Sequence, residues 1–191
     1  SFLEQFAEYI WNVLHGNLGN SLIYQRSVSD MIKVAAPVSI QMAIAAGVIM
    51  AVLGIPLGVL SAVYKNSWAD NSILGTALGC WAVPTYVAGP LLVILLVRGL
   101  NLMAVPYGWE GLFSSKAIIP LMVLAFRPVA IIIRQSRSAV LEVKGEDYIR
   151  TARAKGISNY LVISRHMLRP VLTPIMTALG LVVAFMIQGS I

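Results

Sequence analysis

The chain has 191 residues, of which 58% are hydrophobic and 12% are charged, and its formal net charge is +6. Its mean hydropathy of +0.81 is too high for an ordinary soluble domain. Several apolar stretches reach the roughly 20 residues that a helix needs to cross a bilayer. The apolar runs are continuous rather than alternating, which excludes a membrane β-barrel. The composition therefore predicts an all-α, polytopic membrane protein.

Residues 1–33 are predicted to form an external segment that precedes the membrane domain of residues 34–191. Apolar side chains recur at helical spacing from Phe2 to Leu14, and Gly16 and Gly19 follow. This pattern is typical of an interfacial helix on the outer membrane surface, with Trp11 at headgroup depth. A soluble helix packed on the domain would show the same pattern, so both interpretations stay open.

Four apolar stretches are predicted to be membrane spans. The first covers residues 34–63 and contains Pro56, and the second covers residues 73–97 and contains Pro84 and Pro90. The third covers residues 117–133 and continues as a more polar helix to about residue 143. The fourth begins near residue 171 and is still apolar at residue 191. Small residues at every fourth position of the first stretch indicate close helix packing.

Pro84, Arg127 and Pro128 are candidate pathway or gating residues. A proline inside a span removes a backbone donor and can kink the helix. Arg127 precedes Arg134 by seven residues, which is about 10 Å along a helix and places it within the membrane. A charge at this depth usually faces a cavity or a partner, although it can also snorkel to the headgroups. The apolar spans contain no obvious carboxylate partner for it.

The distribution of basic residues predicts the topology. The loop of residues 134–170 is rich in lysine and arginine and carries few acids, which makes it cytosolic by the positive-inside rule. The turn at residues 64–70 is then also cytosolic, and the loop at residues 99–116 is external. Nucleic-acid binding is not expected, because the basic residues lie on one short membrane-tethered loop. An external N-terminal segment with no preceding span leads us to expect a chain truncated at both ends.

The cytosolic loop contains the start and stop signals of a helix, a glycine turn and a second helix. Residues 146–154 are predicted to be helical with acids at the start, and Gly156 can adopt the left-handed conformation that ends a helix. Ser158 can cap a second helix that ends near Leu168, before Pro170 begins the final span. A short, rigid, basic element of this kind suits docking into a groove of a partner. The alternative is an ordinary positive-inside loop.

No catalytic or cofactor-binding set is visible in the sequence. His15 and His166 lie on opposite sides of the membrane in this topology, and Cys80 is single. No phosphate-binding glycine-lysine loop occurs. We therefore expect no enzyme activity, no cofactor and no metal site, and any nucleotide chemistry would belong to another subunit.

Five segments together resemble a known family of membrane transport proteins. Residues 138–143 and 146–156 resemble the coupling loop of ABC importer permeases, most closely those of the dipeptide, oligopeptide and nickel branch. Residues 165–170 continue the similarity. Residues 53–59 resemble the first core span of that branch, and residues 16–21 resemble its external segment. The similarity extends over nearly the whole chain.

One departure from the general importer signature refines the assignment. That signature has Glu-Ala-Ala, three further residues and Gly, whereas Arg150, Thr151 and Ala152 precede Gly156 here. Arg-Thr-Ala is the usual form in the peptide and nickel branch. The resemblance implies that the residues coupled to the ATPase are Glu146, Asp147, Tyr148, Arg150, Thr151, Ala152, Arg153, Ala154, Lys155 and Gly156.

The resemblance also implies the rest of the assembly. It implies a six-span permease of the bacterial or archaeal cytoplasmic membrane, of which four spans are present, working by alternating access. The partners would be a second permease subunit that is a distinct paralogue, two cytosolic ATPase subunits and an external solute-binding protein. The solute would be a di- or oligopeptide or a related small solute such as nickel.

Two other classes of function remain compatible with the residues alone. An ATP-independent secondary transporter or channel would be expected to show ionisable groups near the midplane, where only Arg127 qualifies. A non-transporting membrane scaffold could use the basic loop to bind lipid or protein.

Overall fold

The computed structural model describes residues 1–189, with side chains to residue 187, and is helical throughout its ordered elements. The helices are α1 (Phe2–Leu14), α2 (Val28–Ile49), α3 (Ile55–Val63), α4 (Trp68–Ala82), α5 (Thr85–Leu92), α6 (Ser115–Lys144), α7 (Asp147–Ala154), α8 (Asn159–Leu161) and α9 (Leu168–Gly189). Three π-helical segments join them: η1 (Met50–Gly54), η2 (Val93–Gly99) and η3 (Val162–Met167). The described residues contain no β-strand, which confirms the all-α prediction.

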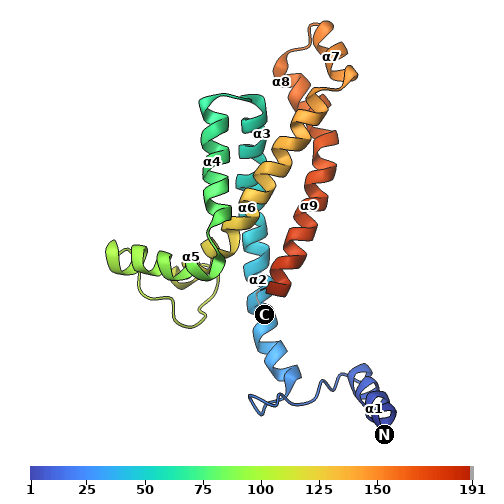
Figure 1. Cartoon of the computed structure of the whole chain (residues 1–191), viewed down its shortest axis with the longest axis vertical. Helices are drawn as coiled ribbons and strands as arrows, with labels where there is room; N and C mark the ends of the chain where they lie inside the picture. Colours follow the sequence, from blue (N-terminus) through green and yellow to red (C-terminus); the bar gives the residue numbers. More distant parts are fainter. Residues whose placement is uncertain (190–191) are drawn as a thin grey trace.

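Three continuous helices are long and apolar enough to cross a membrane. They cover Val28–Val63, Ser115–Lys144 and Asn159–Ile187. A fourth span exists if the bent pair Trp68–Ala82 and Thr85–Gly99 is counted as one. Figure 1 shows α4 beside α3 in the bundle, whereas α5 runs across the bundle direction and projects from it.

The second predicted span is therefore wrong as a continuous helix. Its two halves bend by 99° at Val83 and Pro84. Pro84 cannot donate a backbone hydrogen bond, and it restricts the residue before it to extended conformations. Val83 accordingly adopts φ −78° and ψ 118°, and α4 ends there. Proline chemistry at this position breaks the helix rather than merely kinking it.

The prediction that a separate helix ends near Leu168, before the last span, is also wrong. One helix runs from Asn159 to Ile187 and contains both Pro170 and Pro174. The π-helical segment η3 ends three residues before Pro170. A local widening of this kind lets a membrane helix accommodate a proline without breaking. The second helix of the loop predicted to be cytosolic is thus continuous with the helix of the last span.

Close packing of the first span against α6 depends on glycine. A Cβ atom at Gly58 would lie 2.5 Å from the carbonyl oxygen of Ile133 and 2.5 Å from the Cβ of Ser136. A Cβ atom at Gly54 would lie 2.8 Å from Cγ2 of Ile132. The backbones of these helices therefore approach more closely than any larger residue allows, which confirms the packing predicted from small-residue spacing.

The two ends of the bundle agree with the predicted topology. Figure 1 places the α3–α4 turn at the same end as α7 and α8, and it places α1 at the opposite end, apart from the bundle. No residue of α1 is buried. The structure therefore does not show the alternative in which this helix packs on the domain, and its interfacial position stays a prediction.

Candidate coupling site and transport cavity

Helix α7 is a short element with well-defined ends. Glu146 occupies the N-cap and Asp147 the first turn, where acids interact favourably with the positive helix terminus. The hydroxyl of Thr151 donates to the carbonyl of Asp147 at 2.9 Å. Gly156 follows the helix with φ +76°, a left-handed conformation that disfavours side chains with a Cβ atom. The chain can therefore turn sharply from α7 into α8.

The two faces of α7 have different surroundings. Ile149 and Ala152 are buried and belong to an apolar core, formed by Ala62, Ala139, Val140, Ile149, Ala152, Val162, Met167, Val171 and Ile175. The opposite face is exposed and carries Glu146, Asp147, Tyr148, Arg150, Thr151, Arg153, Ala154, Lys155 and Gly156. Nine of the ten residues expected to couple to an ATPase are therefore accessible, and Ala152 instead holds the helix in place.

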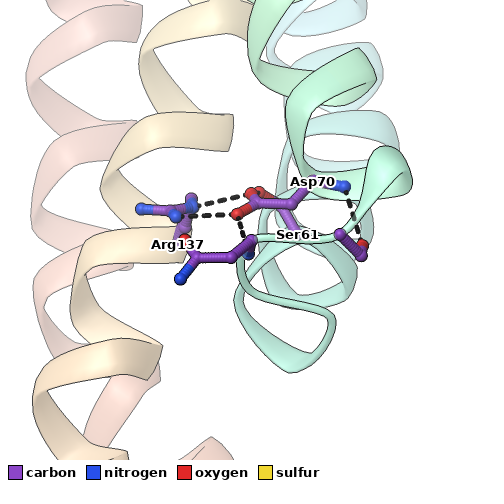
Figure 2. Close-up of polar contacts among 5 residues, drawn as sticks. Ser61, Asp70 and Arg137 are labelled. Carbon is purple, nitrogen blue, oxygen red and sulfur yellow. Dashed lines mark hydrogen bonds and ion pairs between the residues drawn. The ribbon is translucent and has the colours of Figure 1, made fainter.

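A buried ion pair joins Asp70 to Arg137 of α6, as Figure 2 shows. The Asp70 carboxylate is 1% exposed and accepts two hydrogen bonds from Arg137, at 2.9 Å from Nε and 2.9 Å from Nη2. The Ser61 hydroxyl also donates to it, and the Asn66 backbone N–H donates at 2.8 Å. We call Ser61, Asn66, Asp70 and Arg137 the Asp70 network. Every hydrogen bond in it favours a charged carboxylate, which makes burial of that charge tolerable.

Local sequence explains how the Asp70 network forms. Asn66 adopts φ +65°, which asparagine tolerates better than most residues, and this closes the α3–α4 turn. Ser67 caps α4 by accepting a hydrogen bond from the Asp70 N–H at 3.3 Å. Asp70 then points across the hairpin towards α6. The network joins the α3–α4 hairpin to α6, seven residues before α6 ends at Lys144.

Sequence reasoning missed this network. It assigned Asp70 to a cytosolic turn and counted Arg137 only as a positive-inside charge. A useful signal was present: a carboxylate in the first turn of an apolar helix requires a partner, and Arg137 lies inward from most of the basic loop. The pairing itself joins residues 67 positions apart, so it depends on helix packing that no local pattern encodes.

Arg127 and Pro128 both line a cavity of about 830 Å³. Its walls come from α2, α5, η2, α6 and α9, together with Pro106 of the loop predicted to be external. Pro84 does not line the cavity, but the adjacent Thr85 does. The structure thus brings two of the three candidate pathway residues into one cavity and places the third at its edge, where α4 bends into α5.

The guanidinium of Arg127 contacts an aromatic ring rather than a carboxylate. Its Cζ atom lies 5.7 Å from the centroid of the Trp81 ring, and Cζ of Arg134 lies 5.2 Å from the same centroid. Trp81 belongs to the last turn of α4, just before the bend, and is 43% exposed. Cation–π contacts of this kind stabilise a guanidinium without neutralising its charge.

Comparisons with known proteins agree with these features. The family of the binding-protein-dependent transport system inner membrane component matches residues 54–191. The chain is 33% identical to the dipeptide transport system permease protein DppB of Escherichia coli, over 98% of this chain and 64% of that protein. It is 34% identical to a putative peptide transport system permease protein of Brucella abortus and 33% identical to the oligopeptide transport system permease protein OppB of Salmonella typhimurium. Each of these two comparisons covers 98% of this chain and 61% of the relative.

The chain thus spans less than two thirds of the length of these relatives. The match to the family covers well over half of the chain, and its helices are of membrane-crossing length. The chain belongs to the family of binding-protein-dependent transport system inner membrane components and is a multi-pass protein of the cytoplasmic membrane.

Proposed function

We propose that the chain is part of the permease subunit of an ATP-driven, binding-protein-dependent importer of di- or oligopeptides or a related small solute such as nickel. The family supports this proposal, as do relatives named as dipeptide and oligopeptide permeases. The observation that carries it is α7, which presents an exposed polar face while its apolar face is fixed to the ends of two long membrane helices.

In this proposal α7 is the docking element for a cytosolic ATPase subunit. The exposed Arg150, Arg153 and Lys155 suit an acidic groove on that subunit. Ile149 and Ala152 anchor α7 on α6 and on the start of the last span, so a displacement of α7 reaches both helices. ATP binding and hydrolysis can shift the equilibrium between inward- and outward-open states only through such a differential contact.

The Asp70 network extends this rigid body to the α3–α4 hairpin. Because Arg137 on α6 holds Asp70, the hairpin moves with the helix that carries α7. The hairpin leads through α4 to the bend at Pro84, beside the cavity that Arg127 and Pro128 line. Alternating access would then open and close this cavity, with Pro84, Arg127 and Pro128 as pathway or gating residues.

The proposed assembly contains four further components. They are a second permease subunit, which would be a distinct paralogue, two ATPase subunits that perform all ATP hydrolysis, and an external solute-binding protein. This chain would contribute the transmembrane path and no chemistry.

The experiment compares two charge reversals in the full-length complex, reconstituted in proteoliposomes with its binding protein. Arg153→Glu changes the exposed face of α7, whereas Lys65→Glu changes an exposed basic residue of the α3–α4 turn. We expect Arg153→Glu to lower ATP-driven uptake about tenfold or more, because like charges would then meet at the docking face. Lys65→Glu should leave uptake close to that of the unmodified complex.

Other outcomes would support the alternative functions. Uptake that proceeds equally without ATP would indicate a secondary transporter or channel. Purification without ATPase subunits, together with no uptake, would indicate a scaffold. Equal effects of the two charge reversals would show that α7 has no special role in coupling.

A further inference from the structure

The cavity lined by Arg127 carries a positive charge, which favours a negatively charged ligand group. Among the described residues that line it, Arg127 is the only charged side chain. The remaining lining is apolar apart from the hydroxyls of Ser39 and Thr85. The volume of about 830 Å³ is in the range of small-molecule sites, which are mostly apolar with a few polar groups that orient the ligand.

Arg127 has no carboxylate partner in the described part of the chain. The ion pairs there join Asp70 to Arg137, Glu110 to Lys116, Asp147 to Arg150, Asp30 to Lys33 and Glu4 to the N-terminus. In the loop predicted to be external, Glu110 accepts a hydrogen bond from Lys116, which lowers the pKa of Glu110. This carboxylate is therefore paired with Lys116 and not with Arg127. An unpaired guanidinium within a membrane helix is costly unless it serves a ligand or a partner.

We infer that Arg127 binds the carboxylate of the transported solute inside this cavity, an inference that rests on the proposed function. A guanidinium can donate two parallel hydrogen bonds to a carboxylate, and the Trp81 ring, 5.7 Å from Cζ, limits the positions of the guanidinium. The cavity therefore suits a solute with a free carboxylate, such as an unmodified peptide.

The same cavity is unsuited to a free divalent metal ion. The positive charge of Arg127 repels Ni²⁺, and none of the described lining residues is a histidine, cysteine, aspartate or glutamate. Of the two solute classes that the family resemblance leaves open, the cavity favours the peptide class over the free nickel ion.

The test measures equilibrium binding of radiolabelled alanylalanine and its C-terminal amide to the purified full-length complex, without ATP and without the binding protein. The unmodified complex should bind the free acid about tenfold or more tightly than the amide, since a hydrogen bond to a charged group is lost with the amide. Arg127→Gln should weaken binding of the acid by a similar factor and abolish the discrimination. Arg127→Lys should retain part of it.

Arg134→Gln is the matched control. Arg134 contacts the same Trp81 ring from the same helix but does not line the cavity, so its removal should leave the preference for the acid unchanged. Equal binding of acid and amide by the unmodified complex would overturn the inference, as would tighter binding of Ni²⁺ than of the dipeptide. Loss of the second permease subunit in Arg127→Gln but not in Arg134→Gln would also overturn it, because Arg127 would then pair with that subunit.

The binding assay and the uptake experiment can fail independently. Failure of ATP-driven uptake would contradict the assignment as an importer. Failure of the complex to bind the acid more tightly than the amide would contradict only the role of Arg127 in the cavity. A complex that couples ATP hydrolysis to uptake yet does not distinguish the acid from the amide would refute only the role of Arg127.

Discussion

Two arginines on α6 have opposite environments although they lie ten residues, or about 15 Å, apart on one helix. Arg137 faces the α3–α4 hairpin and donates two hydrogen bonds to the buried Asp70 carboxylate. Arg127 faces a cavity, and its guanidinium contacts the ring of Trp81 but no carboxylate of the described residues. The charge of Arg137 holds helices together, whereas Arg127 has no ion pair among the described residues.

The two ends of the bundle also differ. At the end that carries α7, the Asp70 network and an apolar core join the α3–α4 hairpin, α6 and the last span. At the other end, α5 departs from the bundle at the Pro84 bend (Figure 1), and the cavity around Arg127 lies beside a second apolar core of Ala43, Ala46, Ala125 and Met186. The two ends therefore differ in that a buried ion pair adds to apolar packing only at the α7 end of the described residues.

Breaking the Asp70–Arg137 pair should have the largest effect. Asp70→Ala leaves a partly buried guanidinium, 21% exposed, without its carboxylate, and the cost is at most that of an unpaired buried charge, about 3–5 kcal/mol. We expect a clear fall in the thermal unfolding temperature of the purified complex. Replacing both partners, as in Asp70→Asn with Arg137→Met, should cost much less, because no uncompensated charge remains. If the single and double variants unfold at the same temperature, the pair is not what joins the hairpin to α6.

Enlarging Gly58 should have the next largest effect. Its Cβ would meet the Ile133 carbonyl oxygen at 2.5 Å, so Gly58→Ala must separate α3 from α6 at a cost of about 1–3 kcal/mol. Gly75 on α4 offers the control, because its Cβ would meet nothing within 4 Å. Gly75→Ala should be neutral or slightly stabilising, since alanine favours a helix. Equal thermal stability of the two variants would contradict the close approach of these helices.

Replacing Gly156 should have a smaller effect on stability but a specific effect on coupling. A Cβ there would meet nothing within 4 Å, so Gly156→Leu is opposed only by φ +76°, at about 1–2 kcal/mol. We expect the complex to insert into the membrane normally while uptake per ATP hydrolysed falls. Gly156→Asn, which tolerates this conformation, should couple better than Gly156→Leu. Normal uptake by Gly156→Leu would refute the prediction.

The features that sequence predicted well are the local ones. Capping residues predict helix α7 and the glycine turn after it. Charge and helix length predict that the α3–α4 turn lies at the same end of the bundle as the basic loop. Proline was harder to interpret. Pro84 breaks its helix, whereas Pro170 and Pro174 lie within a continuous one. The difference depends on whether neighbouring turns can widen and repack, which the identity of the proline does not specify.

The features that sequence could not predict depend on packing between distant segments. Asp70 and Arg137 were visible as charges, but their pairing requires α3 to approach α6 closely through Gly58. The cavity around Arg127 likewise depends on four helices from different parts of the chain. Ala152 was expected at the docking face because the family signature contains it, yet helical periodicity turns it towards the core.

The most direct test of the central claim is a photo-crosslinking measurement on the full-length complex. A benzophenone amino acid replaces Tyr148, which is exposed on α7, and a second variant carries it at Trp68, which is exposed at the same end of the bundle on α4. We predict that the probe at position 148 crosslinks to the ATPase subunit and that the yield changes when ATP is added. Crosslinking from position 68 alone, or from neither position, would contradict the assignment of α7 as the coupling element.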